Sequence, residues 1–188
     1  VLQEFFARPA GFIFLTPEEE ALVSQRAGRT LQPATTIGAG IEPAGATPAV
    51  DLASIGVPER FVLYLGRVDR NKGCQTLLDY FTEYLDGGGD ATLVLAGPQK
   101  LQVPRYPGIR ALGYVADDVR EALLARAALL VVPSPYESLS IVLLEAWNHA
   151  VPALVNARCK VLQGQVRRAN AGLHYETSRE FKIGRAHV

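Results

Sequence analysis

The chain has 188 residues, 48% of them hydrophobic and 20% charged, which is enough to bury one sizeable core. Lys and Arg together number 19, as do Asp and Glu, and this balance argues against nucleic acid as a partner. The two cysteines, Cys74 and Cys159, have no metal-ligand spacing, and no apolar run approaches the length of a membrane span or signal core. These features predict a soluble α/β protein of the cytoplasm.

Both ends of the sequence are expected to be cut. The chain begins at Val1 and contains no methionine. The last residues, "IGRAHV", are what ATC GGA AGA GCA CAC GTC encodes, a common sequencing-library adapter, so residues 183–188 are set aside from the fold. The alternative is a natural polar tail.

The first predicted elements are a strand end at Gly11 to Leu15 and a helix directly after it. Thr16 is the expected N-cap, Pro17 the first helical residue and Glu19 the partner that completes a capping box. Residues 39–58, rich in Gly, Ala and Pro without periodicity, are predicted to be a linker between domains.

After this linker, apolar strands alternate with helices. The expected strands are "FVLYLG" from Phe61, "TLVLAG" from Thr92, "IRALG" from Ile109, "ALLVVPS" from Ala128 and "PALVN" from Pro152. Apolar residues at helical spacing predict a helix over Leu77 to Leu85, stopped by "DGGGD", and another around Val119 to Leu123. Apolar strands without alternation indicate a parallel sheet covered on both faces, so the fold class is α/β, a Rossmann-like doubly wound parallel sheet.

Ligands of such sheets bind at the carboxyl ends of the strands. The loop "RVDRNKG" after the first of these strands places Arg67, Arg70 and Lys72 just before a helix N-terminus, where cations are unfavourable unless an anion lies between them. A phosphate would resolve the conflict. The alternative is a solvated loop in which Asp69 pairs with one arginine.

Two acids stand in the stretch "PSPYESLSIVLLEAW" from Pro133. A helix from Leu139 to Asn148 that is apolar on all sides should be buried, so Glu145 needs a partner, and a vicinal diol such as that of ribose is one. Glu137 precedes this helix, beside its free N–H groups and the candidate caps Ser138 and Ser140. The alternatives are an ion pair between Glu145 and an arginine at the core edge, and a plain surface role for Glu137.

The E-x7-E spacing of Glu137 and Glu145, together with "LGRVDRNKG", resembles the donor-binding domain of retaining GT-B glycosyltransferases of family 4, the glycosyl transferases group 1. The resemblance implies that residues 1–38 are a remnant of the N-terminal acceptor domain. Residues 59–182 would then be the nucleotide-sugar domain, truncated at its C-terminal end.

The same resemblance implies roles for particular residues. Arg67 and Lys72 would grip the donor diphosphate, and Glu137 would hold hydroxyls of the transferred sugar; these three are the implied catalytic residues. Glu145 would bind the ribose diol. Backbone groups would contact the sugar, the phosphate and the nucleobase at Ser138, Leu139, Ser140, Ile141, Tyr114 and Val115.

The implied reaction is hexosyl transfer with retention from a nucleoside-diphosphate sugar to a glycan or lipid-linked acceptor, without metal or other cofactor. Bacterial polysaccharide assembly at the inner face of the membrane, with contact through the missing N-terminal domain, is the expected setting. The chain by itself is expected to be inactive.

Some residues depart from the family pattern. Ser140 and Ala150 stand where many relatives have glycine.

Two other functions compete with glycosyl transfer. A non-catalytic nucleotide-sugar-binding module stays open, whereas a dinucleotide-dependent oxidoreductase is disfavoured because "GAGIEPAG" at Gly38 has a misplaced third glycine and Pro43 where a helix should open.

Overall fold

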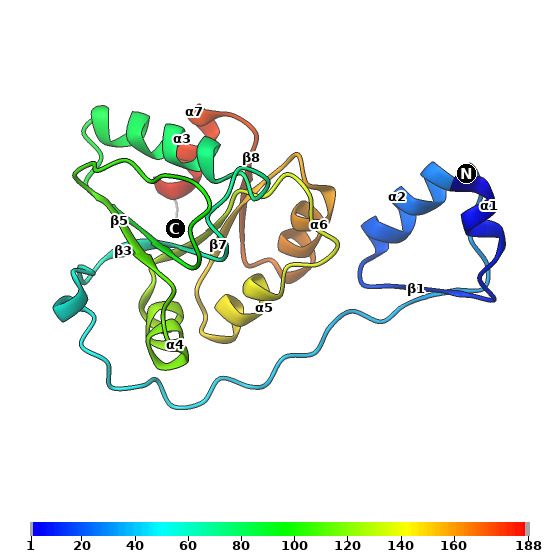
Figure 1. The fold of residues 1–188 in the computed structure, drawn as a ribbon, viewed down its shortest axis with the longest axis horizontal. Helices are drawn as coiled ribbons and strands as arrows, with labels where there is room; N and C mark the ends of the chain where they lie inside the picture. Colours follow the sequence, from blue (N-terminus) through cyan, green and yellow to red (C-terminus); the bar gives the residue numbers. More distant parts are fainter. Residues whose placement is uncertain (1, 187–188) are drawn as a thin grey trace.

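The structure is a computed structural model and describes residues 2–186. Its larger unit is built on a six-stranded sheet with the strand order β5-β4-β3-β6-β7-β8 (Figure 1). All neighbouring strands are parallel. The strands are β3 (Phe61–Leu65), β4 (Thr92–Ala96), β5 (Ile109–Gly113), β6 (Leu129–Val132), β7 (Ala153–Asn156) and β8 (Gly172–Tyr175). The predicted Rossmann-like parallel sheet is therefore confirmed.

Helices cover both faces of this sheet because successive residues of each strand point to opposite sides. Phe61 and Leu63 of β3 pack in one core with α4 (Asp117–Arg126), α5 (Ile141–Asn148) and α6 (Lys160–Ala169). Val62 and Tyr64 pack in a second core with α3 (Cys74–Asp86) and α7 (Ser178–Ala186). The apolar spacing from Leu77 onward correctly predicted α3, which ends before Gly87.

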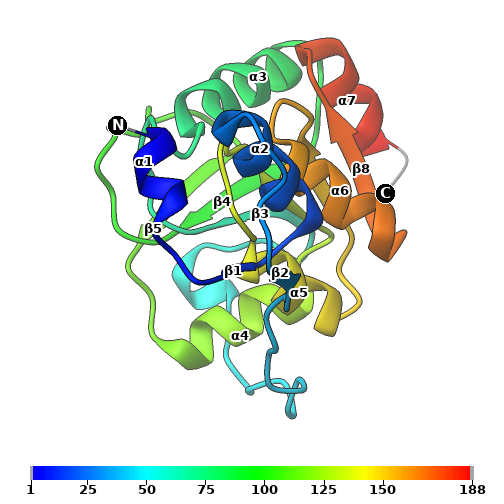
Figure 2. The same cartoon turned by 90° about the vertical axis from the view of Figure 1, so that its right-hand side faces the viewer.

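The smaller unit comprises α1 (Leu2–Ala7), β1 (Phe12–Phe14), α2 (Pro17–Ala27) and β2 (Ala34–Thr36), with β1 and β2 paired in parallel. The predicted N-cap is confirmed, since the Thr16 hydroxyl accepts a hydrogen bond from the Glu19 N–H at 3.2 Å. The Glu19 carboxylate in turn accepts from the N–H of Leu15 at 2.8 Å. α2 lies against α6 of the larger unit (Figure 2).

The predicted linker, residues 39–58, follows an extended path between the two units as far as the short 3-10 helix η1 (Ala53–Ile55) (Figure 1). Its last part belongs to the larger unit, because Leu52 and Val57 are buried in the core. Asn148 and Arg126 donate hydrogen bonds to linker carbonyl oxygens, those of Glu42 and Val50, both at 2.9 Å.

Three elements at the C-terminal end had no sequence prediction: α6, β8 and α7. Helix α7 continues to Ala186, over part of the segment attributed to an adapter, and residues 187–188 of that segment lie outside the described residues. Within residues 2–186, none of the helices combines the length and apolarity needed to cross a bilayer.

Candidate functional site

A cavity of about 230 Å³ opens at the carboxyl ends of β3 and β6, beside the start of α5. These two strands are neighbours in the middle of the sheet, and the chain order reverses between them. The crevice at such a reversal is where open α/β sheets bind ligands. The charged side chains that line the cavity are Arg67, Lys72 and Glu137, so the structure brings together the three implied catalytic residues.

The loop after β3 approaches the loop after β6 closely because of a glycine. Gly73, with φ of 75°, is in the left-handed region, and a Cβ built on it would lie 2.2 Å from the Pro133 carbonyl oxygen. Any larger residue would push the two loops apart. Gly73 also precedes the first residue of α3 and so sets the start of that helix beside the cavity.

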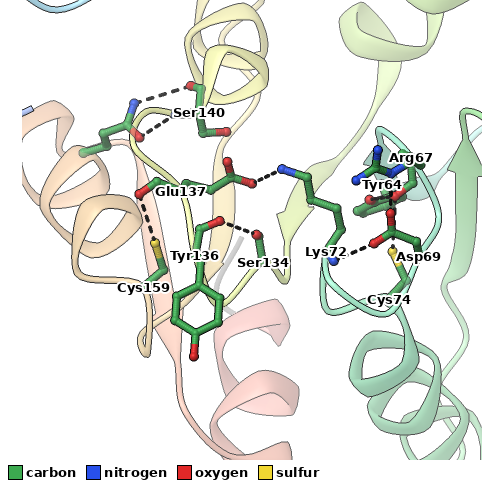
Figure 3. Close-up of polar contacts among 11 residues, drawn as sticks. Tyr64, Arg67, Asp69, Lys72, Cys74, Ser134, Tyr136, Glu137, Ser140 and Cys159 are labelled. Carbon is green, nitrogen blue, oxygen red and sulfur yellow. Dashed lines mark hydrogen bonds and ion pairs between the residues drawn. The ribbon is translucent and has the colours of Figure 1, made fainter. Parts of the chain in front are cut away.

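An ion pair joins the two loops across the cavity (Figure 3). The Lys72 Nζ lies 2.7 Å from Oε1 of Glu137, and these side chains are 37% and 17% exposed. Glu137 is thus held at the site, and the alternative of a plain surface acid is wrong. The pair leaves the ammonium group at the cavity wall, partly open to solvent.

Arg67 pairs with Asp69 on the same loop (Figure 3), as the solvated-loop alternative supposed. The Asp69 carboxylate also accepts a hydrogen bond from the backbone N–H of Lys72 at 2.8 Å. This backbone bond, followed by the Arg67 guanidinium, lowers the pKa of Asp69 against the opposing effect of its burial. Asp69 therefore stays ionised and fixes the turn that carries Lys72, while the Arg67 side chain remains 52% exposed.

The side chain of Tyr64 on β3 also holds this turn in place. Its hydroxyl donates a hydrogen bond to the Arg67 carbonyl oxygen at 2.7 Å. Burial and the neighbouring Cys74 raise the pKa of Tyr64 well above its ordinary value, and burial also raises the pKa of the Cys74 thiol. Both groups remain neutral, so they contribute shape and hydrogen bonds to the site and no charge.

The start of α5 is fixed differently from the prediction. Ser140 holds the N-cap position, but neither Ser140 nor Ser138 caps the helix with its side chain. Instead the Ser140 N–H donates to Oε1 of Gln165 on α6 at 3.0 Å, and the Ser138 carbonyl accepts from the Thr16 hydroxyl at 3.1 Å. Sequence reasoning missed Gln165, a 6% exposed amide whose only signal was a polar residue on the apolar side of α6.

Some of the residues whose backbone was expected to contact the donor line the cavity, and others lie outside it. Leu139, Ser140 and Ile141 line the cavity. Ser138 instead lines a separate hollow beside α2. Tyr114 and Val115 lie in the loop between β5 and α4, where Tyr114 is 79% exposed.

Glu145 has a protein partner. Its carboxylate pairs with the guanidinium of Arg120 on α4, which also lies 3.0 Å from Glu121. This is the arginine partner weighed as the alternative to a diol. The expectation that α5 is buried on all sides is wrong, because only Leu143 and Ala146 are buried and Ile141 is 53% exposed. A carboxylate at the half-buried boundary between two helices is accommodated by such a pair.

The arrangement favours an anionic ligand that also carries hydroxyl groups. Two cations and the starts of α3 and α5 supply positive charge, and Glu137 supplies a carboxylate that accepts hydrogen bonds from hydroxyls. Among residues 2–186, no three His, Cys, Asp or Glu side chains are grouped so that they could hold a metal ion.

Comparison with known proteins agrees with this geometry. The chain is 29% identical over 111 residues to an alpha-D-kanosaminyltransferase of Streptomyces kanamyceticus, covering 54% of this chain and 29% of that protein. It is 32% identical over 115 residues to an uncharacterized glycosyltransferase of Methanocaldococcus jannaschii, covering 55% of this chain and 29% of that one. The matched part of the chain therefore spans 29% of the length of each of these two relatives.

Among solved structures, a sucrose-phosphate synthase from Thermosynechococcus elongatus superposes with a TM-score of 0.78 at 21% identity. The superposition covers 98% of this chain and 50% of that protein, which shows a shared GT-B fold. Residues 59–181 match the family described as glycosyl transferases group 1. Since this match covers most of the larger unit, including Arg67, Lys72 and both acids of the E-x7-E pair, the chain belongs to the glycosyl transferases group 1 family.

Proposed function

We propose that the protein is a retaining glycosyltransferase of family 4 and that the cavity between β3 and β6 binds the diphosphate and sugar of a nucleoside-diphosphate sugar. The observation that carries this proposal is the Lys72–Glu137 ion pair, 2.7 Å long, at the reversal point of the sheet. It sets a cation for phosphate and an acceptor for sugar hydroxyls side by side. The acceptor is a glycan or a lipid-linked glycan.

The chemical role of the cations follows from where charge develops. When the bond between the sugar and the diphosphate breaks, negative charge grows on the departing phosphate. Lys72 and Arg67, with the starts of α3 and α5, stabilise that charge in place of a metal ion. Because Asp69 and Glu137 already hold these two cations, little reorganisation is needed when the donor binds.

The remaining donor contacts are proposed from the family pattern. Glu145 binds the ribose hydroxyls while Arg120 keeps its carboxylate in place. Backbone groups at Tyr114 and Val115 contact the nucleobase from the loop between β5 and α4.

Binding of a nucleoside diphosphate tests the site directly. Titration calorimetry with UDP, ADP and GDP in the presence of a chelator should show binding to this chain. Lys72→Ala should weaken it by about 1.5–3 kcal/mol, because a charge-assisted contact is lost. Arg70→Ala is the matched control: Arg70 is an exposed cation of the same loop that does not line the cavity. Undiminished binding in Lys72→Ala, or an absolute requirement for a divalent metal, would contradict the proposal.

Sugar transfer is proposed to need, besides the two units of this chain, a complete acceptor domain. The sucrose-phosphate synthase that this chain resembles is about twice as long, since the chain covers 50% of it. Positioning of two substrates supplies about 7–11 kcal/mol of a barrier, so the chain alone should bind donor and transfer no sugar at an efficient rate. Assaying it beside a form extended by an acceptor domain, with candidate sugar nucleotides, checks this; equal turnover by both would refute it and leave no need for the acceptor domain.

A further inference from the structure

A second and larger cavity, about 630 Å³ in volume, lies between the two units of the chain. One wall is α2, and the other is formed by the loop 135–138 and the start of α6. This cavity adjoins the donor cavity, because Glu137 lines both. In Figure 3 Tyr136 extends away from the Lys72–Glu137 pair, and this residue is 84% exposed.

The acids of this second cavity are already neutralised. Glu18 of α2 pairs with Arg168 of α6, and Glu137 pairs with Lys72. The first of these pairs joins α2 to α6 beside the cavity. A Cβ at Gly164 would lie 1.9 Å from Oε1 of Glu18, so the Glu18 carboxylate approaches the backbone of α6 closely at this glycine.

Three cations, Arg26, Arg158 and Lys160, also line this cavity. Arg26 projects from α2, Lys160 is the first residue of α6, and Arg158 directly precedes the N-cap residue Cys159 of that helix. Within residues 2–186 no acid forms an ion pair with any of the three. Cations gathered around one hollow with low-dielectric walls create a positive potential that concentrates anions.

Apolar side chains lie between these cations. Leu22 is 50% exposed on the α2 wall, and the Tyr136 ring faces solvent from the opposite loop. A hollow lined by apolar and aromatic groups with a few charged ones binds a ligand that has both a ring or chain and a charged end. The cavity is therefore suited to a sugar that carries a phosphate.

We propose that this cavity binds the phosphate of an anionic, sugar-bearing acceptor through Arg26, Arg158 and Lys160, beside the donor sugar at Glu137. This proposal rests on the glycosyltransferase function proposed above, and it narrows the acceptor to a phosphorylated class. A soluble sugar phosphate and a lipid-linked sugar phosphate share this chemistry, and the test separates them.

The test uses amide shifts of the ¹⁵N-labelled chain, with the donor cavity saturated by the nucleoside diphosphate that binds best. Glucose 6-phosphate should shift the amide resonances of residues around Lys160, whereas glucose at the same concentration should leave them unchanged. Octyl phosphate forms the third arm: tighter binding of octyl phosphate than of glucose 6-phosphate indicates a lipid-linked acceptor, and the reverse indicates a soluble one.

Charge-removing variants supply the specificity control. Arg158→Gln and Lys160→Gln should each weaken glucose 6-phosphate binding about fivefold, as for a solvent-accessible charge contact. Arg167→Gln removes the same charge from an exposed position of α6 outside the cavity and should change nothing. If a variant in or beside α6 fails to fold, Arg26→Gln repeats the test from α2 of the smaller unit.

The outcomes distinguish the two proposals. Equal binding of glucose and glucose 6-phosphate, or unchanged glucose 6-phosphate affinity in the Arg158, Lys160 and Arg26 variants, would overturn the acceptor-phosphate site. Binding of a nucleoside diphosphate in the same experiments would still support the donor site. Binding of glucose 6-phosphate at Lys160 without any nucleoside diphosphate binding would do the reverse: the anion site would stand and the donor assignment would fall.

Discussion

Replacement of Gly73 by alanine should damage the fold and the donor site together. Gly73 lies between Lys72 and the first residue of α3, with φ of 75°. A Cβ there would stand 2.2 Å from the Pro133 carbonyl oxygen and 2.8 Å from the carbonyl carbon. Both are backbone atoms, so rotation of a side chain cannot relieve the clash.

The expected magnitude has two parts. A non-glycine residue in the left-handed region costs about 1–2 kcal/mol. Forcing an extra carbon into a closed contact costs about 1–3 kcal/mol more. Gly73→Ala should therefore lower the free energy of unfolding by about 2–5 kcal/mol. Gly88→Ala is the control, because Gly88 has φ of 87° with nothing within 4 Å of the added Cβ, so it should lose only about 1–2 kcal/mol.

Urea unfolding of the wild-type chain and both variants measures the difference. Nucleoside diphosphate affinity, measured under conditions where each variant is folded, adds a functional reading: only Gly73→Ala should weaken binding, because only it separates Lys72 from Glu137. If Gly73→Ala is no less stable than Gly88→Ala and binds equally well, the two loops do not meet as the structure shows, and the account of how the site is assembled fails.

Further predictions concern the acids and one strained residue. In a form of the protein that transfers sugar, Glu137→Gln should slow transfer and keep nucleoside diphosphate affinity within about threefold. Glu145→Gln should instead weaken that affinity. Calorimetry and turnover assays on both variants check this, and a reversed pattern would mean that the two roles are exchanged. Ala150 has φ of 58°, in the left-handed region. Ala150→Gly removes the steric cost of that conformation but increases the conformational entropy of the unfolded chain, so the free energy of unfolding should rise by about 0.5–1 kcal/mol. Thermal and urea unfolding check this value, and a less stable variant would contradict it.

Local patterns in the sequence were sufficient for the elements that are determined locally. The Thr16 capping box, the apolar spacing of α3 and the strand runs all act through neighbours within a few residues, and the structure has each of them. The resemblance to a family then located Lys72 and Glu137 at one cavity.

The pairing of charges required the tertiary structure. Lys72 and Glu137 are 65 residues apart in sequence, and Glu145 and Arg120 are 25 apart. No local rule selects which of many cations meets a given acid, because that choice depends on how the helices pack. The burial of α5 was mispredicted for the same reason: its apolar composition does not tell which neighbours leave Ile141 open to solvent.

The sequence by itself thus determined the strands, several of the helices and the chemical types at the ends of the strands, since backbone preference and apolar periodicity are properties of short segments. Only the tertiary structure decided that Gln165 holds the start of α5 and that Glu18 meets Arg168. It also decided that Arg26, Arg158 and Lys160 face one hollow. These contacts join segments far apart in the chain, and the free energy that fixes them comes from packing the two units and the helices of both faces onto one sheet.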